Sequence, residues 1–300
     1  MLHRLTISDI LFFKPIKKEM IKMKKCWFDR KTVIITGASS GIGKDITEKL
    51  IKEHGCKVIG IARNKERLEL FRESLGSCSA SFSYYTFDVS VKENWEKFAE
   101  DAEKDNLKPD ILINNAGILP KFDRFDNYSV EEIDKAMQIN FYSCVYSMKA
   151  LMPLILKSDS AAIVNIASSA ALCSLAGTSV YSASKAALKS LTDAIREEHR
   201  HDCYIGLVCP GFTKTNIFCN QGVAVEGTAQ KAINLISTDC ERMTKLIING
   251  MKHKKGDMVF GADAHFMSVG NKVLGTACSH ISSKVMEISK LELFKKVFEK

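Results

Sequence analysis

Short apolar runs rich in β-branched residues alternate with charged amphipathic segments along most of the chain, and this alternation constrains its fold most strongly. Six runs predict buried strands, at residues 32–36, 57–62, 83–87, 110–114, 161–167 and 204–209. Amphipathic segments between them predict helices, at residues 44–54, 64–75 and 91–104. Alternating strands and helices indicate βαβ units, whose right-handed crossovers cover a parallel sheet on both faces. The sequence therefore predicts an α/β protein built on a doubly wound parallel sheet.

The alternation also suggests how the chain is divided. No linker-like composition or internal repeat interrupts it, so we expect one Rossmann-type domain over residues 31–300, in three α/β/α layers. Amphipathic patterns from about residue 262 predict extra C-terminal helices that form a tail. Residues 1–30 precede the first strand, and we expect them to form a basic, poorly ordered extension. A true start at Met20 or Met23 stays open.

Charge and cysteine content limit the partners and the compartment. Residues 1–31 carry +6 of the net charge of +8, so the remaining chain is nearly neutral and does not suggest a nucleic-acid binder. The ten cysteines follow no zinc-ligand spacing, and unpatterned thiols are typical of a reducing compartment. The longest charge-free run, residues 160–184, is too polar for a membrane span, and the apolar patch at 10–13 is too short for a secretory signal. We expect a cytoplasmic protein without a metal.

The first predicted strand leads directly into the Gly-rich segment TGASSGIG, residues 36–43, and then into a helix. Gly37 permits a tight turn, Gly41 lets the backbone approach a phosphate, and Gly43 allows close packing of helix on strand. Unpaired N–H groups and the helix dipole then favour an anion. The segment predicts a dinucleotide pyrophosphate site formed by Gly37, Ser39, Ser40, Gly41, Ile42 and Gly43.

The end of the second predicted strand bears on the form of the dinucleotide. An acidic residue there would bind the ribose 2′-hydroxyl of NAD, whereas arginine suits the 2′-phosphate of NADP. The chain has Ala62 and then Arg63, with no acid at this place. We infer that NADP(H) is preferred over NAD(H), with Arg63 as an ordinary exposed residue of a helix start as the alternative.

Tyr181 and Lys185 stand four residues apart in YSASK, on a helix expected to begin near Ser179. This spacing places them on one helix face. A neighbouring ammonium lowers the pKa of a phenol, which would make Tyr181 an acid–base catalyst near neutral pH. Ser168 or Ser169, at the end of the fifth predicted strand, lies where open parallel sheets bind ligands. Either serine is suited to bind a substrate oxygen, or simply to cap its own turn.

The order of these motifs, over about residues 31–220, closely resembles the single-domain short-chain dehydrogenase/reductase family. The resemblance rests on TGASSGIG at 36–43, Asp88 in FDV, NNAG at 114–117, Asn140, Ser168, YSASK at 181–185 and PG at 210–211.

The resemblance implies a role for each matched position. Tyr181 would act as the general acid or base, and Lys185 would lower its pKa and hold the nicotinamide ribose. Ser168 would polarise the substrate carbonyl, and Asn140, at a helix kink, would hold a water that links Lys185 to solvent. Further cofactor contacts are expected from Asp88, Val89, Asn115, Ala116, Gly117, Pro210, Gly211 and Thr213.

Apolar residues flank the matched motifs and predict a hydrophobic substrate, although packing against one another is the alternative. They are Leu119, Phe122, Leu172, Cys173, Phe212, Ile217 and Phe218. The leading interpretation is an NADP(H)-dependent oxidoreductase that interconverts a hydrophobic secondary alcohol with its ketone or aldehyde, on a steroid-, retinoid- or lipid-like substrate. A 3-oxoacyl thioester reductase, with Lys121 and Lys214 near an acidic carrier, is an alternative. A non-catalytic dinucleotide sensor is a second one.

The resemblance also implies a homodimer or homotetramer, formed through the helices that follow the fourth and fifth strands. The segment 142–156 and the helix after Tyr181 are apolar enough for this role. A peripheral membrane contact is a further hypothesis. It would use the basic head and an apolar stripe at the C-terminus, formed by Leu291, Leu293, Phe294, Val297 and Phe298.

Overall fold

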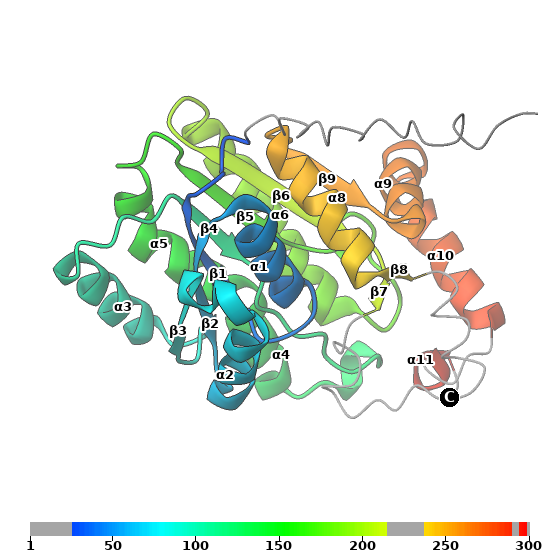
Figure 1. The fold of residues 1–300 in the computed structure, drawn as a ribbon. Helices are drawn as coiled ribbons and strands as arrows, with labels where there is room; N and C mark the ends of the chain where they lie inside the picture. Colours follow the sequence, from blue (N-terminus) through cyan, green and yellow to red (C-terminus); the bar gives the residue numbers. More distant parts are fainter. Residues whose placement is uncertain (1–25, 215–236, 290–293, 299–300) are drawn as a thin grey trace, which may run out of the picture.

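Parallel strands in the order β3-β2-β1-β4-β5-β6-β9 form the centre of the structure, a computed structural model that describes residues 26–214, 237–289 and 294–298 (Figure 1). The order reverses between β1 and β4, which opens a crevice at the carboxyl ends of the strands. This arrangement confirms the predicted doubly wound sheet. The strands are β1 Thr32–Thr36, β2 Lys57–Ala62, β3 Phe82–Thr86, β4 Ile111–Asn114, β5 Ala162–Ile166, β6 Tyr204–Pro210 and β9 Asp257–Phe260.

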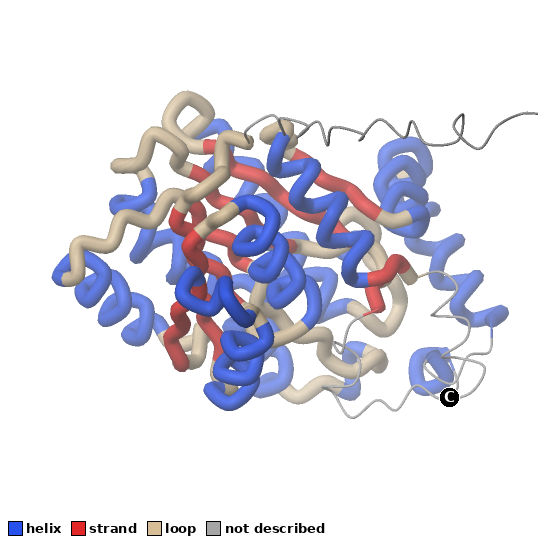
Figure 2. Tube along the Cα trace, in the orientation of Figure 1, coloured by secondary structure: helices blue, strands red, loops and turns tan. Residues whose placement is uncertain are grey.

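Helices cover both faces of the sheet (Figure 2). Strand β1 shows why, because Val33 and Ile35 point into one core cluster and Ile34 into the other, and all three are fully buried. The first cluster includes residues of α1 (Gly41–His54), α2 (Lys65–Ser74) and α8 (Cys240–Lys252). The second includes residues of α3 (Lys92–Lys104), α5 (Ser143–Ile155) and α6 (Ser179–Glu198). Helix α1 begins three residues before the predicted start at residue 44, because Gly41–Gly43 already form its first turn.

Shorter elements connect this framework. They are the 3₁₀ turns Gly76–Ser81, Phe125–Asn127 and Ser169–Ala171, helix α4 (Val130–Met137), and the parallel two-residue strands β7 (Thr213–Lys214) and β8 (Thr238–Asp239). The extra C-terminal helices are present as α9 (Ala262–Leu274), α10 (Thr276–Ser289) and α11 (Lys295–Phe298). Among the described residues, no helix combines the length and apolar content needed to cross a membrane.

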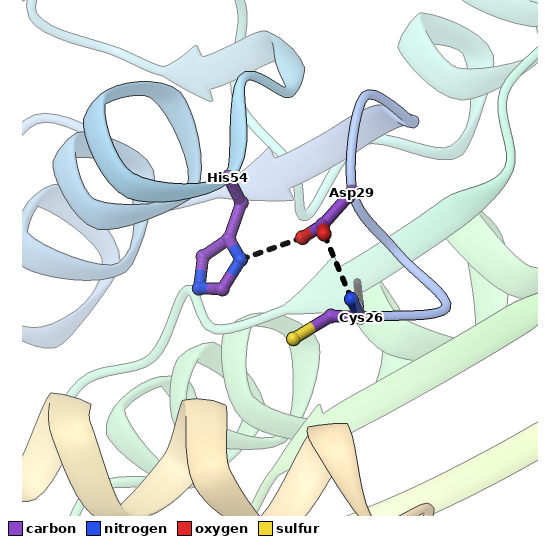
Figure 3. Close-up of side chains that lie close together, drawn as sticks. All are labelled: Cys26, Asp29 and His54. Atoms are coloured by element: carbon purple, nitrogen blue, oxygen red, sulfur yellow. Dashed lines mark hydrogen bonds and ion pairs between the residues drawn. The ribbon is translucent and has the colours of Figure 1, made fainter. Parts of the chain in front are cut away.

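Residues 26–30, which the sequence assigns to a poorly ordered extension, pack against the domain. Phe28 is fully buried, and the Trp27 indole donates to the carbonyl oxygen of Met251 (2.9 Å). Figure 3 shows that the Asp29 carboxylate joins the Cys26 N–H (2.7 Å) and Nδ1 of His54 (2.8 Å). The sulfur, nitrogen and oxygen atoms of these three side chains lie within 4.8 Å of one another. Hydrogen bonds to both carboxylate oxygens explain the cluster as an anchor of this segment to α1.

Candidate active site

The Gly-rich turn between β1 and α1 forms one end of a cavity at the carboxyl edge of the sheet. Gly37 and Gly41 have φ angles of +68° and +54°, which other residues rarely adopt. A Cβ on Gly43 would lie 2.4 Å from Nδ2 of Asn115 and 2.5 Å from the Gly37 oxygen. Ser40 caps α1 in an extended conformation without a side-chain hydrogen bond, and the first turn holds no acidic residue. The open N–H groups and the close approach of the backbone fit a pyrophosphate.

Hydrogen bonds join the turn to the residues after β4, and no motif in the sequence predicts them. The hydroxyl of Thr36 accepts from the backbone N–H groups of Asn115 and Ala116, both at 2.9 Å. In the opposite direction, the Asn115 amide donates to the Thr36 carbonyl oxygen (2.9 Å). Asn115 therefore fixes the shape of the cradle for a dinucleotide.

Arg63 and Asp88 lie at the ends of β2 and β3, beside the cradle but outside the lining of the cavity. Nη1 of Arg63 lies 3.8 Å from Oδ2 of Asp88, and the two side chains are 64% and 37% exposed. Although burial opposes ionisation of Asp88, hydrogen bonds from Ser90 and the Arg63 guanidinium outweigh it and lower the Asp88 pKa. Val89 packs into the core, away from the cavity.

Tyr181, Lys185 and Ser168 line the same cavity. The helix α6 carries Tyr181 and Lys185 one turn apart, and Nζ of Lys185 donates to the carbonyl oxygen of Ile166 (3.0 Å). Ser168 accepts from the N–H of Ala170 (3.2 Å) and also makes a side-chain hydrogen bond with Tyr181. The serine thus caps its own turn, and its side chain also contacts the tyrosine.

The pKa of Tyr181 departs from the expectation that Lys185 lowers it. Burial raises the pKa of Tyr181 more than the hydrogen bond from Ser168 lowers it. Burial also lowers the pKa of Lys185. The expectation fails because the buried ammonium of Lys185 is directed at the carbonyl oxygen of Ile166, and burial of the partly exposed Tyr181 raises the pKa of its phenol.

Asn140 lies in a π-helical turn, Gln138–Tyr142, that joins α4 to α5. Such turns are frequent at functional sites. The Asn140 amide donates to the Ile118 carbonyl oxygen (2.9 Å) and the Ser184 hydroxyl (3.0 Å), and it accepts the Ile118 N–H (2.8 Å). Asn140 does not itself line the cavity, and it joins the segment after β4 to α6, the helix that carries Lys185.

The structure brings most of the predicted residues together around this cavity. Sixteen of them line it: Gly37, Ser40, Gly41, Ile42, Asn115, Ala116, Gly117, Leu119, Phe122, Ser168, Tyr181, Lys185, Pro210, Gly211, Phe212 and Thr213. Ser39 and Gly43 belong to the same Gly-rich segment without lining the cavity. The predicted pocket residues Ile217 and Phe218 lie outside the described residues.

The substrate end of the cavity differs from the predicted one. Leu172 packs with the core cluster under α3 and α5, and Cys173 packs against Cys278 and Met267, so neither lines the cavity. Further residues line it that the sequence did not indicate, above all Leu175, Thr178 and Met267. Thr178 stands directly before α6, the helix that carries Tyr181, so its position in the sequence could have identified it as a residue of the cavity. Met267 lies in the C-terminal segment, where no motif marks it.

Comparisons with known proteins agree with this geometry. The family described as short chain dehydrogenase matches residues 31–224. A relative from Arabidopsis thaliana named 11-beta-hydroxysteroid dehydrogenase-like 2 is 34% identical and covers 84% of this chain and 82% of its own length. Two solved short-chain dehydrogenases share the fold at 23% identity. One from Sphingobium yanoikuyae with NADPH has a TM-score of 0.69 (87% of this chain, 96% of the other). One from Burkholderia phymatum with NAD has a TM-score of 0.71 (89% and 97%).

Proposed function

Because the chain belongs to the short-chain dehydrogenase family, we propose that it is an NADP(H)-dependent oxidoreductase that interconverts a hydrophobic secondary alcohol with its ketone or aldehyde. The observation that carries this proposal is the cavity itself. Its Gly-rich turn suits a pyrophosphate, Ser168, Tyr181 and Lys185 line it together, and Leu119, Phe122, Leu175 and Met267 give it an apolar part.

A bound nicotinamide dinucleotide supplies or accepts the hydride in this chemistry. The Gly-rich turn, Asn115, Lys185 and Thr213 would hold it. In the reducing direction, the Tyr181 hydroxyl donates its proton to the substrate oxygen as hydride reaches the carbon. Ser168 donates a hydrogen bond to the same oxygen, where negative charge develops. In the oxidising direction Tyr181 takes the proton back.

The preference for NADP(H) rests on Arg63. Its guanidinium is exposed at the end of β2, and the pair with Asp88 is long, at 3.8 Å. A ribose phosphate can compete for such a guanidinium, because charge-assisted hydrogen bonds to phosphate are strong and bidentate.

The apolar end of the cavity favours a hydrophobic substrate of the steroid, retinoid or lipid type, in keeping with the name of the Arabidopsis relative. The 3-oxoacyl thioester alternative is less well supported, since both lysines offered for it have partners. Lys121 pairs with Glu132 (3.1 Å), and Lys214 pairs with Asp239 (2.8 Å). The sensor alternative is also less favoured, because Tyr181, Lys185 and Ser168 line one cavity.

The reaction class can be tested by following the hydride. The protein is incubated with NADPH that carries deuterium at the transferable position and with a hydrophobic ketone, and the product is analysed by mass spectrometry. The proposal expects an alcohol heavier by one deuterium at the carbinol carbon. An unlabelled alcohol would point to another hydride source, and no alcohol from any ketone would contradict the proposal.

We further propose a homodimer or homotetramer that uses α5 and α6, in a cytoplasmic setting. The two ends of the α5 segment, Tyr142 and Leu156, are 39% and 36% exposed although both are large and apolar. Sedimentation velocity should give the mass of a dimer or tetramer, and Tyr142→Glu should shift it toward the monomer. A monomer at all concentrations would contradict this part.

A further inference from the structure

Asp263, in the first turn of α9, contacts the segment that closes the cofactor end of the cavity. Its Oδ2 accepts the backbone N–H of Phe212 at 2.7 Å. Gly211, Phe212 and Thr213 all line the cavity, whereas Asp263 lies behind them. Asp263 also lies beyond residues 31–224, the part of the chain that the family matches.

The fit between this carboxylate and two glycines is close. A Cβ on Gly211 would lie 2.0 Å from Oδ1 of Asp263, and one on Gly261 would lie 2.6 Å from the same atom. Gly261 has a φ of +112°, a conformation that side chains rarely allow. The carboxylate therefore occupies the space that a side chain at either position would need.

This contact is maintained in a largely buried site, although the first turn of α9 favours an acidic side chain. Oδ1 is buried and has no hydrogen-bond partner among the described residues. Burial raises the pKa of Asp263, and hydrogen bonds from the backbone N–H groups of Phe212, Ala264 and Asp263 itself only partly offset this. Buried polar atoms without partners destabilise a fold and are uncommon, so each one suggests a purpose.

The segment also makes contacts through its backbone and within itself. The Gly211 N–H donates to the Phe260 carbonyl oxygen (2.8 Å), and the Phe212 carbonyl oxygen accepts the Thr238 N–H (2.8 Å). The Thr213 hydroxyl donates to the Gly211 carbonyl oxygen (3.0 Å). Asp263 is a side chain of α9 that bonds directly to the peptide between Gly211 and Phe212, and it can fix the orientation of that peptide.

We propose that Asp263 is a positioning residue, which holds the Gly211–Thr213 segment in the conformation that binds the nicotinamide end of the dinucleotide. The inference rests on the proposed function for the identity of that ligand. It also links α9 to both ends of the cavity, because Met267 lies one helical turn after Asp263 and lines the substrate end.

Two variants of similar size separate positioning from folding. Asp263→Asn keeps an oxygen that can accept the Phe212 N–H, whereas Asp263→Leu removes both this acceptor and the buried charge. Replacing a buried charge by an apolar group often stabilises a protein. Asp263→Leu should therefore unfold at the same temperature as the parent or higher, yet bind NADPH roughly tenfold more weakly, the usual effect of losing a hydrogen bond to a charged group. The Kd of Asp263→Asn for NADPH should stay within about threefold of the parent value. The asparagine oxygen still accepts the Phe212 N–H, and weakening this hydrogen bond costs less than losing it.

Asp110 provides the matched control. Its carboxylate also accepts a backbone N–H, that of Thr32 at 2.8 Å, but at the amino end of the sheet. Asp110→Ala should lower the unfolding temperature and leave the Kd for NADPH unchanged. All Kd values are measured by titration of the full-length protein, without a substrate.

The outcomes distinguish the two proposals. Unchanged NADPH binding by Asp263→Leu would overturn the positioning role, and so would weaker binding that only accompanies a lower unfolding temperature. The expected binding pattern in a protein that reduces no carbonyl would support the positioning role and contradict the proposed function. A parent protein that binds no dinucleotide would overturn both.

Discussion

Nη1 of Arg63 lies 3.8 Å from Oδ2 of Asp88, so two residues expected to contact the adenosine half of a dinucleotide pair with each other across the ends of β2 and β3. Both are substantially exposed, and surface ion pairs of this length contribute little to stability. The pair therefore keeps the guanidinium near the cradle without holding it firmly. A ligand phosphate can replace the carboxylate as its partner.

The first prediction concerns the choice of cofactor. Arg63→Ala should weaken NADPH binding by roughly tenfold or more, because a charged hydrogen bond to the 2′-phosphate is lost, and should change NADH binding little. Titration with each nucleotide gives the two Kd values. Lys65→Ala removes a nearby cation, the first residue of α2, that pairs with Glu69 (3.6 Å), and should affect neither. Equal losses for NADPH and NADH in Arg63→Ala would contradict the argument.

The second prediction concerns the proton donor. Tyr181→Phe should abolish turnover while NADPH binding stays nearly intact, because the phenol acts on the substrate oxygen and the ring is retained. Losing a general acid usually lowers the rate by roughly 10²–10⁴-fold. Tyr84→Phe removes a hydroxyl that bonds Glu69 (3.0 Å) far from the cavity and serves as the control. Turnover that survives in Tyr181→Phe would assign the acid–base role elsewhere.

The third prediction follows from the raised pKa of Tyr181. Reduction needs the protonated phenol, so its rate should stay level across neutral and mildly alkaline pH. Oxidation needs the phenolate, so its rate should rise with pH over the same range. Rate profiles in both directions, at saturating cofactor, provide the measurement. A reduction rate that already falls near neutral pH would show that the bound ligand lowers the pKa below its ordinary value.

The fourth prediction concerns the folding stability that is lost because the Lys185 ammonium is buried. Its side chain is buried, and no carboxylate in the described ranges pairs with it. Since burial lowers its pKa below the unfolded value, stability should rise as pH increases from the folded pKa toward the unfolded pKa of 10.5.

Lys185→Met should therefore stabilise the protein at neutral pH, measured without cofactor, by about 1–4 kcal/mol, while abolishing activity. Urea unfolding measures the difference. Lys189→Met, which removes a partly exposed ammonium paired with Asp193 (2.7 Å), should not stabilise. A loss of stability in Lys185→Met would contradict the account.

The fifth prediction concerns the substrate end. Met267 is 6% exposed and lines the cavity from α9, so Met267→Ala should enlarge it and Met267→Phe should reduce it. The ratio of kcat/KM for a bulky ketone to that for a small one should rise in the first variant and fall in the second, by roughly tenfold each. Met243→Ala truncates a fully buried methionine of α8 outside the cavity and should leave the ratio unchanged. The same ratio in all variants would exclude Met267 from the substrate wall.

The fold was predictable because its signal is local. Apolar β-branched runs define β1 to β6 to within one residue at each end, and the Gly-rich segment positions the turn after β1. The centre of the candidate site was predictable for the same reason, since Tyr181 and Lys185 lie within one helical turn and Ser168 follows a strand directly.

The unpredicted parts depend on contacts between distant segments. Asp263 and Met267 reach the cavity from α9, and no motif in the tail marks them. The direction of the Tyr181 pKa depends on burial, which the spacing of Tyr181 and Lys185 does not encode. Cys173 contacts Cys278, which is 105 residues away in the chain. The sequence around Cys173 therefore could not show that its side chain points away from the cavity.

The central claim is that this cavity transfers hydride from NADPH to a hydrophobic carbonyl compound. The most direct test follows the oxidation of NADPH and NADH, with the parent protein and Tyr181→Phe, against steroid ketones, retinal, medium-chain ketones and 3-oxoacyl thioesters. The account predicts turnover of an apolar carbonyl class with NADPH preferred, and none with Tyr181→Phe. No turnover of any compound in the panel despite NADPH binding, or equal activity in Tyr181→Phe, would contradict the central claim.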